Sequence, residues 1–259
     1  MPRLLFIGDI VGRPGRSRIL QNLAKIKEDY AIDIVVANAE NAAGGNGITR
    51  NIAEELHLAG VDAITLGDHV WDQKIFVSEI EGLDYVCRPA NLPASCPGRS
   101  FLIIEKNGFS LGICVVLGRQ FMYALKADCP FLTADTVLKI LQTRVQATLF
   151  EIHAEATSEK IALGWYLDGR VSALMGTHTH VTTADLCILP QGTAYQTDVG
   201  MSGAHDSVLG REKEPVIKKF ITGLPQVFEL AKNDVKIKGT IIDIDAKTGK
   251  SLHVEGFIY

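Results

Sequence analysis

Apolar residues in the first third of the chain fall into short continuous runs, which are typical of strands covered on both faces. Between the first two runs, Ile19, Leu23 and Ile26 have the spacing of one helix face. Thr49 is a suitable N-cap for a later helix. We therefore expect strands at 4–8, 33–37 and 62–66, joined by helices at 16–30, 50–59 and 72–80. This order predicts parallel strand–helix–strand units.

The pattern changes in the middle of the chain. Asn107-Gly108 lies between two apolar runs and has the sequence of a tight hairpin turn. Further strands are expected at 101–105, 110–117, 148–153, 171–176, 184–189, 193–197, 227–230, 235–245 and 251–258, with helices at 133–146, 154–167 and 214–222. Parallel units followed by antiparallel strands predict an α/β fold in which two sheets pack together with helices outside. No low-complexity linker interrupts the chain, so we expect one domain over residues 1–259.

Composition narrows the class of protein. With 259 residues, 47% of them hydrophobic, the chain can bury a large core. The formal charge is −4, and the chain has no run of basic residues that could bind along a phosphate backbone. Both features argue against stable nucleic-acid binding. We find no signal peptide and no stretch of about 18 apolar residues, so we expect a cytoplasmic protein with no membrane span. Five scattered cysteines without a Cys-x-x-Cys pair indicate neither a disulfide framework nor a thiolate zinc site.

Acidic, amide and imidazole side chains follow five of the apolar runs. They are Asp9, Glu40, Asn41, Asp68, His69, His153, His178 and His180. The carboxyl ends of parallel strands share one edge of a sheet, where ligands bind, so we expect these groups to converge. At any single position a cap or turn residue would be the simpler interpretation, but histidine is a poor helix cap. The recurrence of the pattern therefore favours a metal site.

His178 and His180 form the most compact part of this pattern. Two residues apart in an extended chain, they would point to one face and approach the same small volume. The alternative is a pair of polar residues in a surface loop, because a lone His-x-His is a short motif. Glu155, two residues after His153, could contact a metal-binding side chain without binding the metal itself.

The mixture of donors limits the choice of metal. Imidazole and carboxylate without thiolate favour manganese, iron or zinc, whereas a set of oxygen atoms alone would favour magnesium or calcium. Seven or more candidate ligands are too many for one tetrahedral ion. Two ions about 3.5–4 Å apart, sharing a carboxylate, would use all of them, and such pairs act on both the attacking and leaving oxygens of a phosphoryl group.

Four blocks resemble those of the calcineurin-like metallophosphoesterases: Gly8-Asp9, Glu40-Asn41, Gly67-Asp68-His69 and Gly176-Thr-His178-Thr-His180. The chain is similar in particular to the bacterial YmdB-type subfamily, through blocks that begin at Asn38, His153, Gly176 and Gly192 and extend along nearly the whole chain. The resemblance implies a four-layer αββα sandwich with mixed sheets. It also implies a dinuclear site, often of iron or manganese with zinc as a further option, which cleaves phosphodiesters including 2′,3′-cyclic nucleotides.

The resemblance also implies a role for each residue of the pattern. One metal would be held by Asp9, Asn41 and His180, the other by Asp68, His153 and His178, with Glu40 bridging the two. A metal-bridging hydroxide would attack phosphorus, and His69 would protonate the leaving oxygen, as an imidazole can near neutral pH. No residue that recognises the substrate is singled out by the sequence.

Two other functions stay open at this point. One is another dinuclear hydrolase of the amidohydrolase type, in which, by resemblance, the His-x-His would lie on the first strand of a barrel. The other is a metal-bound regulatory or scaffold protein with weak or no turnover, for which Asp68 is the only indication. A homo-oligomer is a further option, because compact bacterial enzymes of this size commonly associate through symmetric contacts.

Asp68 departs from the family pattern, which has asparagine at this position; it is either a natural variant or an altered residue. An aspartate can ligate a metal, but it adds negative charge and removes an amide donor. We expect Asp68→Asn to retain two metals and to raise phosphodiesterase turnover, measured at full metal occupancy. Unchanged or lower turnover in the fully loaded variant would contradict this prediction.

Overall fold

The computed structural model describes residues 1–259 and contains two six-stranded sheets. The first sheet has the order β15-β14-β1-β3-β4-β5. Its strands are β1 (Arg3–Ile7), β3 (Ile34–Asn38), β4 (Ala63–Thr65), β5 (Val86–Cys87), β14 (Lys238–Ile244) and β15 (Ser251–Ile258). Strands β1, β3, β4 and β5 are parallel, whereas β14 and β15 are antiparallel to their neighbours.

The second sheet has the order β10-β11-β9-β8-β7-β6. Its strands are β6 (Leu102–Lys106), β7 (Phe109–Leu117), β8 (Ala147–His153), β9 (Ala173–Thr177), β10 (Cys187–Ile188) and β11 (Ala194–Gln196). The four central strands are parallel and the two edge strands antiparallel. A small third sheet joins β2 (Asp9–Ile10), β12 (Met201–Ala204) and β13 (Val235–Lys236).

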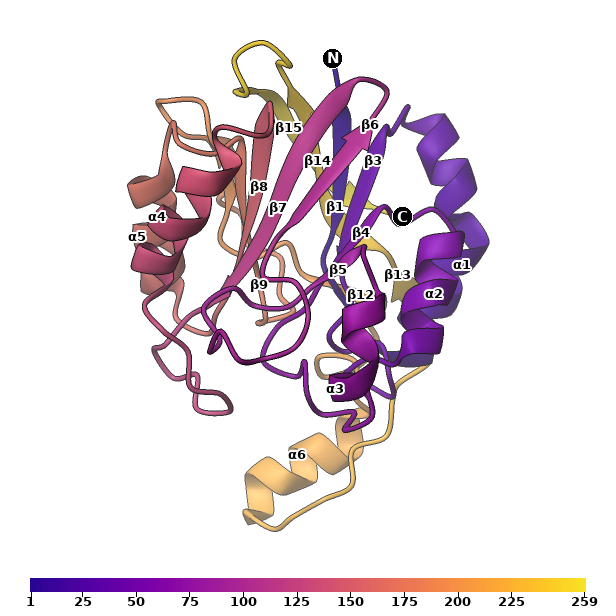
Figure 1. Cartoon of the computed structure of the whole chain (residues 1–259). Coiled ribbons are helices and arrows are strands. Elements are labelled where there is room, and N and C mark those ends of the chain that lie inside the picture. The colour runs from indigo at the N-terminus through magenta and orange to yellow at the C-terminus, as the bar shows by residue number, and fades with distance from the viewer.

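Helices cover the outer face of each large sheet (Figure 1). The first sheet is covered by α1 (Gly12–Asp29), α2 (Arg50–Leu58), α3 (Phe76–Glu79) and the 3₁₀ turn η1 (Ile80–Gly82), the second by α4 (Pro130–Leu141) and α5 (Thr157–Leu167). The remaining helix, α6 (Lys213–Thr222), projects away from the sheets. No helix has both the length and the apolarity that a membrane crossing requires.

Alternating residues on β1 show how the layers are held together. Leu5 and Ile7 belong to the core beneath the helices of the first sheet, while Leu4 and Phe6 belong to a core shared with the second sheet. A third core lies between the second sheet and α4 and α5. The order of layers is helix, sheet, sheet, helix, which confirms the αββα sandwich with mixed sheets.

Local sequence signals explain several of these elements. Asn107 and Gly108 both have positive φ, 52° and 75°, as the two-residue turn between β6 and β7 requires. The side chain of Thr49 accepts a hydrogen bond from the Ile52 amide at 3.4 Å and so caps α2. Both predictions are confirmed.

Other predictions differ from the structure. The helix expected at 72–80 is only α3 followed by η1, and the strand expected at 227–230 is a single bridge between Leu230 and Arg211. The late antiparallel strand β14 pairs with β1 and so joins the first sheet, an assignment that the sequence did not predict. Strands β2, β5 and β12 were not predicted, since two to four residues carry too little periodicity.

The shared core between the sheets generates a stability prediction. Phe6 is fully buried there, so Phe6→Ala would leave a cavity that two packed sheets cannot close. We expect a loss of about 3–5 kcal/mol in the free energy of unfolding, measured by urea denaturation. Leu58→Ala is the control: Leu58 is 86% exposed, so its effect should stay within about 0.5 kcal/mol. Similar losses in the two variants would contradict the assignment of this core.

Candidate metal centre

The carboxyl ends of strands from both large sheets bring the predicted residues together. Asp9 follows β1, Glu40 and Asn41 follow β3, and Asp68 follows β4. His153 is the last residue of β8, and His178 follows β9. Four of these residues, Glu40, Asp68, His153 and His178, offer ligand atoms that all lie within 4.8 Å of one another. The structure therefore contains a cluster that can bind a metal ion.

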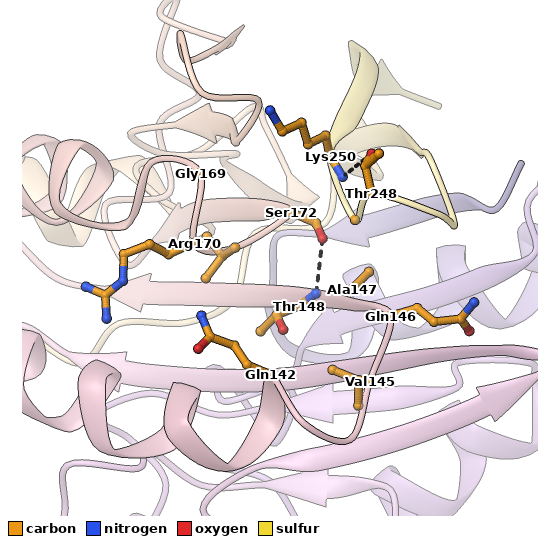
Figure 2. Close-up of a pocket in the computed structure, with 12 residues that line it drawn as sticks. Gln142, Val145, Gln146, Ala147, Thr148, Gly169, Arg170, Ser172, Thr248 and Lys250 are labelled. Atoms are coloured by element: carbon orange, nitrogen blue, oxygen red, sulfur yellow. Dashed lines mark hydrogen bonds between the residues drawn. The ribbon is translucent and has the colours of Figure 1, made fainter.

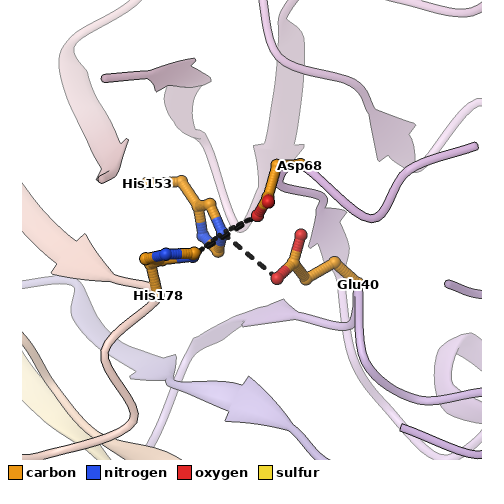
Figure 3. A group of neighbouring side chains, drawn as sticks. All are labelled: Glu40, Asp68, His153 and His178. Carbon is orange, nitrogen blue, oxygen red and sulfur yellow. Dashed lines mark hydrogen bonds and ion pairs between the residues drawn. The ribbon is translucent and has the colours of Figure 1, made fainter. Parts of the chain in front are cut away.

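His153 lies at the centre of this cluster (Figure 3). Its Nε2 atom is 3.0 Å from Asp68 Oδ1, 3.1 Å from Glu40 Oε1 and 3.1 Å from His178 Nδ1. Two imidazole nitrogens at this distance face each other with a proton or a cation between them, because two lone pairs repel. The first sheet supplies the carboxylates and the second supplies the imidazoles.

Asp9, Asn41 and His180 lie beside the cluster. Asn41 Nδ2 is 3.0 Å from Glu40 Oε1 and 3.3 Å from His180 Nε2, while Asp9 Oδ1 is 4.0 Å from the same His180 atom. Asp9 Oδ1 and His180 Nδ1 are buried without any hydrogen-bond partner. A buried carboxylate oxygen without a partner is costly, and a cation would satisfy it. These residues therefore fit a second metal position.

The backbone at His178 and His180 corrects one prediction. Neither residue is extended: their φ angles are 97° and 64°, in the left-handed region. The two rings nevertheless approach the same small volume, because Asn41 and Glu40 connect the His180 ring to the contact between His153 and His178. His178 turns toward His153 and Asp68, and His180 turns toward Asn41.

Burial and neighbouring charges shift the protonation of the site. Burial raises the pKa of Asp9 despite the opposing effect of His180 and His153. Burial also opposes ionisation of Asp68, but hydrogen bonds with His153 and His178 outweigh it and hold its pKa below the usual value. Burial lowers the pKa of His153, yet the carboxylates of Glu40 and Asp68 raise it well above normal. A metal ion that replaces the imidazole proton would stabilise the same carboxylates.

A further set of buried polar residues orients His153. Its Nδ1 atom is 2.8 Å from Thr177 Oγ1, which donates to Glu151 Oε1 at 2.6 Å. Asn38 Nδ2 donates to the same Glu151 oxygen at 2.6 Å, and Asn38 Oδ1 accepts from the Glu40 amide. Burial raises the pKa of Glu151 to about 7. Such contacts fix the direction of a ligating imidazole.

Our sequence interpretation missed Asn38, Glu151 and Thr177. The signal was present, because Asn38 is the last residue of a buried apolar strand and Glu151 lies inside another, where an unpaired polar group is costly. Glu155 does contact the centre as expected: its Oε2 atom is 3.2 Å from His178 Nε2. Polar residues within the strands and polar residues that follow the strands thus contact the same candidate metal site.

His69 lies next to the cluster but outside it. Its backbone amide donates to Glu40 Oε2 at 3.0 Å, and its Nδ1 atom is 2.8 Å from Asp72 Oδ2. The side chain is 32% exposed. Burial lowers the pKa of His69, but Glu40, Asp68 and Asp72 together raise it above its usual value. With Nδ1 engaged by Asp72, Nε2 is available to exchange a proton with another group.

The hollow shown in Figure 2 lies at the opposite ends of the same strands. It is lined by residues near the start of β8 and β9, such as Thr148 and Ser172, and by Arg170 and Lys250. No carboxylate, imidazole or thiol lines it. The metal-ligand chemistry of the chain is therefore confined to the other edge of the sheets.

Comparisons with known proteins agree with this arrangement. The family model described as YmdB-like protein matches residues 5–257. The chain is 46% identical to a 2′,3′-cyclic-nucleotide 2′-phosphodiesterase of Bacillus subtilis, over 98% of this chain and 95% of that protein. Its fold is similar to crystal structures of a hypothetical protein from Thermus thermophilus and of a novel phosphatase from Mycoplasma pneumoniae. The TM-scores are 0.91 and 0.94, at 42% and 36% identity, covering 99% and 100% of this chain and 98% and 93% of theirs.

Gly67 provides a direct test of the centre. A Cβ at this position would overlap Glu40 Oε2 and His153 Nε2, so Gly67→Ala would push both side chains apart. We expect the variant to fold and to lose at least one metal, measured by metal analysis after equilibrium dialysis against Mn²⁺. Gly256→Ala in β15 is the control, because Gly256 does not have a positive φ and a Cβ there would come no closer than 4.0 Å to Leu186 Cδ2. Full metal content in Gly67→Ala would contradict the ligand assignment.

Proposed function

Because the chain belongs to the YmdB-like protein family, we propose that it is a dinuclear metal-dependent phosphodiesterase that hydrolyses small phosphodiesters such as 2′,3′-cyclic nucleotides. The observation that carries the proposal is the convergence of Glu40, Asp68, His153 and His178 at one edge of two sheets. The name of the relative from Bacillus subtilis supports the choice of substrate.

The residues divide between two metal positions. Asp9, Asn41 and His180 would hold one ion, Asp68, His153 and His178 the other, with Glu40 between them. The unpartnered Asp9 Oδ1, 4.0 Å from His180 Nε2, supports the first position, and the short distances around His153 Nε2 support the second. When bound, such a pair of ions supplies a nucleophile from water near neutral pH and neutralises charge on the phosphate.

Manganese or iron suits this mixture of imidazole and oxygen donors, and zinc is a further option. We also propose that residues 1–259 form one domain, that the protein is cytoplasmic and that it can assemble as a homo-oligomer.

The amidohydrolase alternative required a barrel, whereas the strands form two stacked sheets. The regulatory alternative rests on Asp68 alone.

We propose that His69 protonates the departing oxygen. Asp72 holds Nδ1 and the Glu40 carboxylate holds the backbone amide, so the imidazole is oriented from two sides. Burial lowers the pKa of His69, whereas Glu40, Asp68 and Asp72 raise it; Asp72 is the one of these carboxylates that is not a proposed metal ligand. In this arrangement Nε2 donates its proton to the sugar oxygen as the bond to phosphorus breaks.

Metal analysis and three substrates test the proposed function. The purified protein, loaded with Mn²⁺, is assayed with 2′,3′-cyclic AMP, with bis(4-nitrophenyl) phosphate and with 4-nitrophenyl phosphate. We expect two metals per chain and hydrolysis of both diesters in preference to the monoester. Two bound metals without turnover of any phosphate would favour a regulatory role, and a chain that binds no metal would overturn the proposal.

The role of His69 gives a separate prediction. We expect His69→Gln to retain two metals and to lower kcat for 2′,3′-cyclic AMP by roughly 10²–10⁴-fold. The loss should be smaller for bis(4-nitrophenyl) phosphate, because 4-nitrophenolate departs without a proton. His57→Gln is the control, since His57 stacks on Tyr85 away from the site. An equal loss on both substrates would argue against proton donation.

A further inference from the structure

Lys160 and Asp198 form a fully buried ion pair that the proposed chemistry does not use. Lys160 Nζ lies 2.9 Å from Asp198 Oδ2, and neither side chain is exposed to solvent. A completely buried lysine is rare, because its charge must be compensated within the protein. Lys160 belongs to α5 and Asp198 follows β11, so neither comes from a strand end that carries a predicted ligand.

Both members of the pair hold the backbone around the two histidines. Lys160 Nζ also donates to the Thr177 carbonyl at 2.6 Å, immediately before His178. Asp198 Oδ2 accepts from the Thr179 amide at 3.0 Å and from the Thr179 hydroxyl at 2.8 Å. Its other oxygen accepts from the Gly200 amide at 2.9 Å. The residue between the two histidines is therefore fixed from inside the protein.

The backbone that is held in this way is strained. His178 and His180, on either side of Thr179, both have positive φ. A left-handed conformation costs a non-glycine residue on the order of 1–2 kcal/mol and persists only when its surroundings impose it. The contacts from Asp198 and Lys160 lie between and before these two residues, where they impose the turn.

The two histidines depend on this turn to different degrees. His178 has its own contacts: its amide donates to Asp9 Oδ2 at 3.1 Å, and its ring contacts Glu155 and His153. The His180 ring contacts only Asn41, at 3.3 Å, apart from the more distant Asp9, and its Nδ1 atom has no partner. The direction of His180 is thus set chiefly by the backbone.

We propose that Lys160 and Asp198 are positioning residues that aim His180 at its metal, so that the ion on Asp9, Asn41 and His180 depends on this pair more than the other ion does. This inference rests on the proposed function. An ion pair that only stabilised the fold would affect unfolding and leave both metal affinities unchanged. If the ion pair sets the turn, its removal weakens the binding of one metal ion more than that of the other.

The double variant Lys160→Met/Asp198→Asn tests the proposal without leaving a single buried charge. Arg3→Met/Asp243→Asn is the matched control, because that pair also joins distant segments but lies at the start of β1, away from the site. Binding of Mn²⁺ is measured by equilibrium dialysis, and coupling between the two ions by electron paramagnetic resonance. We expect the affinity for one Mn²⁺ to fall roughly 10–100-fold. The signal of a coupled pair should give way to that of isolated Mn²⁺.

Wild-type affinity for both ions in the double variant would overturn the proposal, as would an equal loss in the control. If circular dichroism shows that the double variant does not fold, the positioning role is tested with Thr179→Ala instead. It removes only the hydroxyl contact with Asp198 and should still weaken one ion more than the other. Unchanged affinities in that variant would refute the positioning role.

A separate measurement distinguishes this proposal from the proposed function. If the wild-type chain binds no Mn²⁺, the proposed function fails. The direction of the His180 ring is then followed by ¹H–¹⁵N imidazole spectra, assigned with His180→Gln. The positioning role requires the His180 signals to shift in the double variant and to stay in place in the control; unshifted signals would overturn it.

Discussion

Asp9 and Glu40 are buried beside the partly buried Asp68, and these three carboxylates require positive charge to stabilise them. The rest of the structure follows from that requirement. Asp9 and Glu40 have almost no exposure, and His153 has none. An isolated carboxylate in such surroundings is strongly destabilised unless it is paired or bound to a metal. The protein cannot meet this need with lysine or arginine, since none contacts Asp9, Glu40 or Asp68. The metal ions that we propose for this centre would supply the missing charge.

The sandwich is the means by which the two kinds of ligand meet. Carboxylates come from strands of the first sheet and imidazoles from strands of the second, so the spacing between the sheets sets the distances around His153. That spacing is determined by the apolar residues packed between the sheets, among them Phe6, Val36, Val115 and Met175. Because this core is close-packed, the site gains rigidity from residues that never touch it.

The sequence predicted the parts of the fold that have strong periodicity. The parallel strands, the turn at Asn107-Gly108 and the cap at Thr49 were all predictable, because local chemistry and tertiary structure agree there. The ligand residues were predictable because each ends an apolar run. The left-handed turn at His178 and His180 was not, since a contact with Asp198 imposes it from a distant part of the chain. The role of Lys160 was hidden for the same reason: its partners lie in other elements.

The place of β14 has a consequence for the order in which the protein is made. This strand lies beside β1, with Leu5 opposite Ile241, although the two are separated by almost the entire chain (Figure 1). Until β14 has been translated, β1 can pair only with β3. Its other edge is exposed and can pair with a wrong strand. Asp9 lies two residues beyond β1 and pairs with Met201 of β12, so the segments that help to fix its position are made late in translation. A chain that stops before β14 would therefore leave one edge of β1 unpaired and Asp9 less firmly positioned.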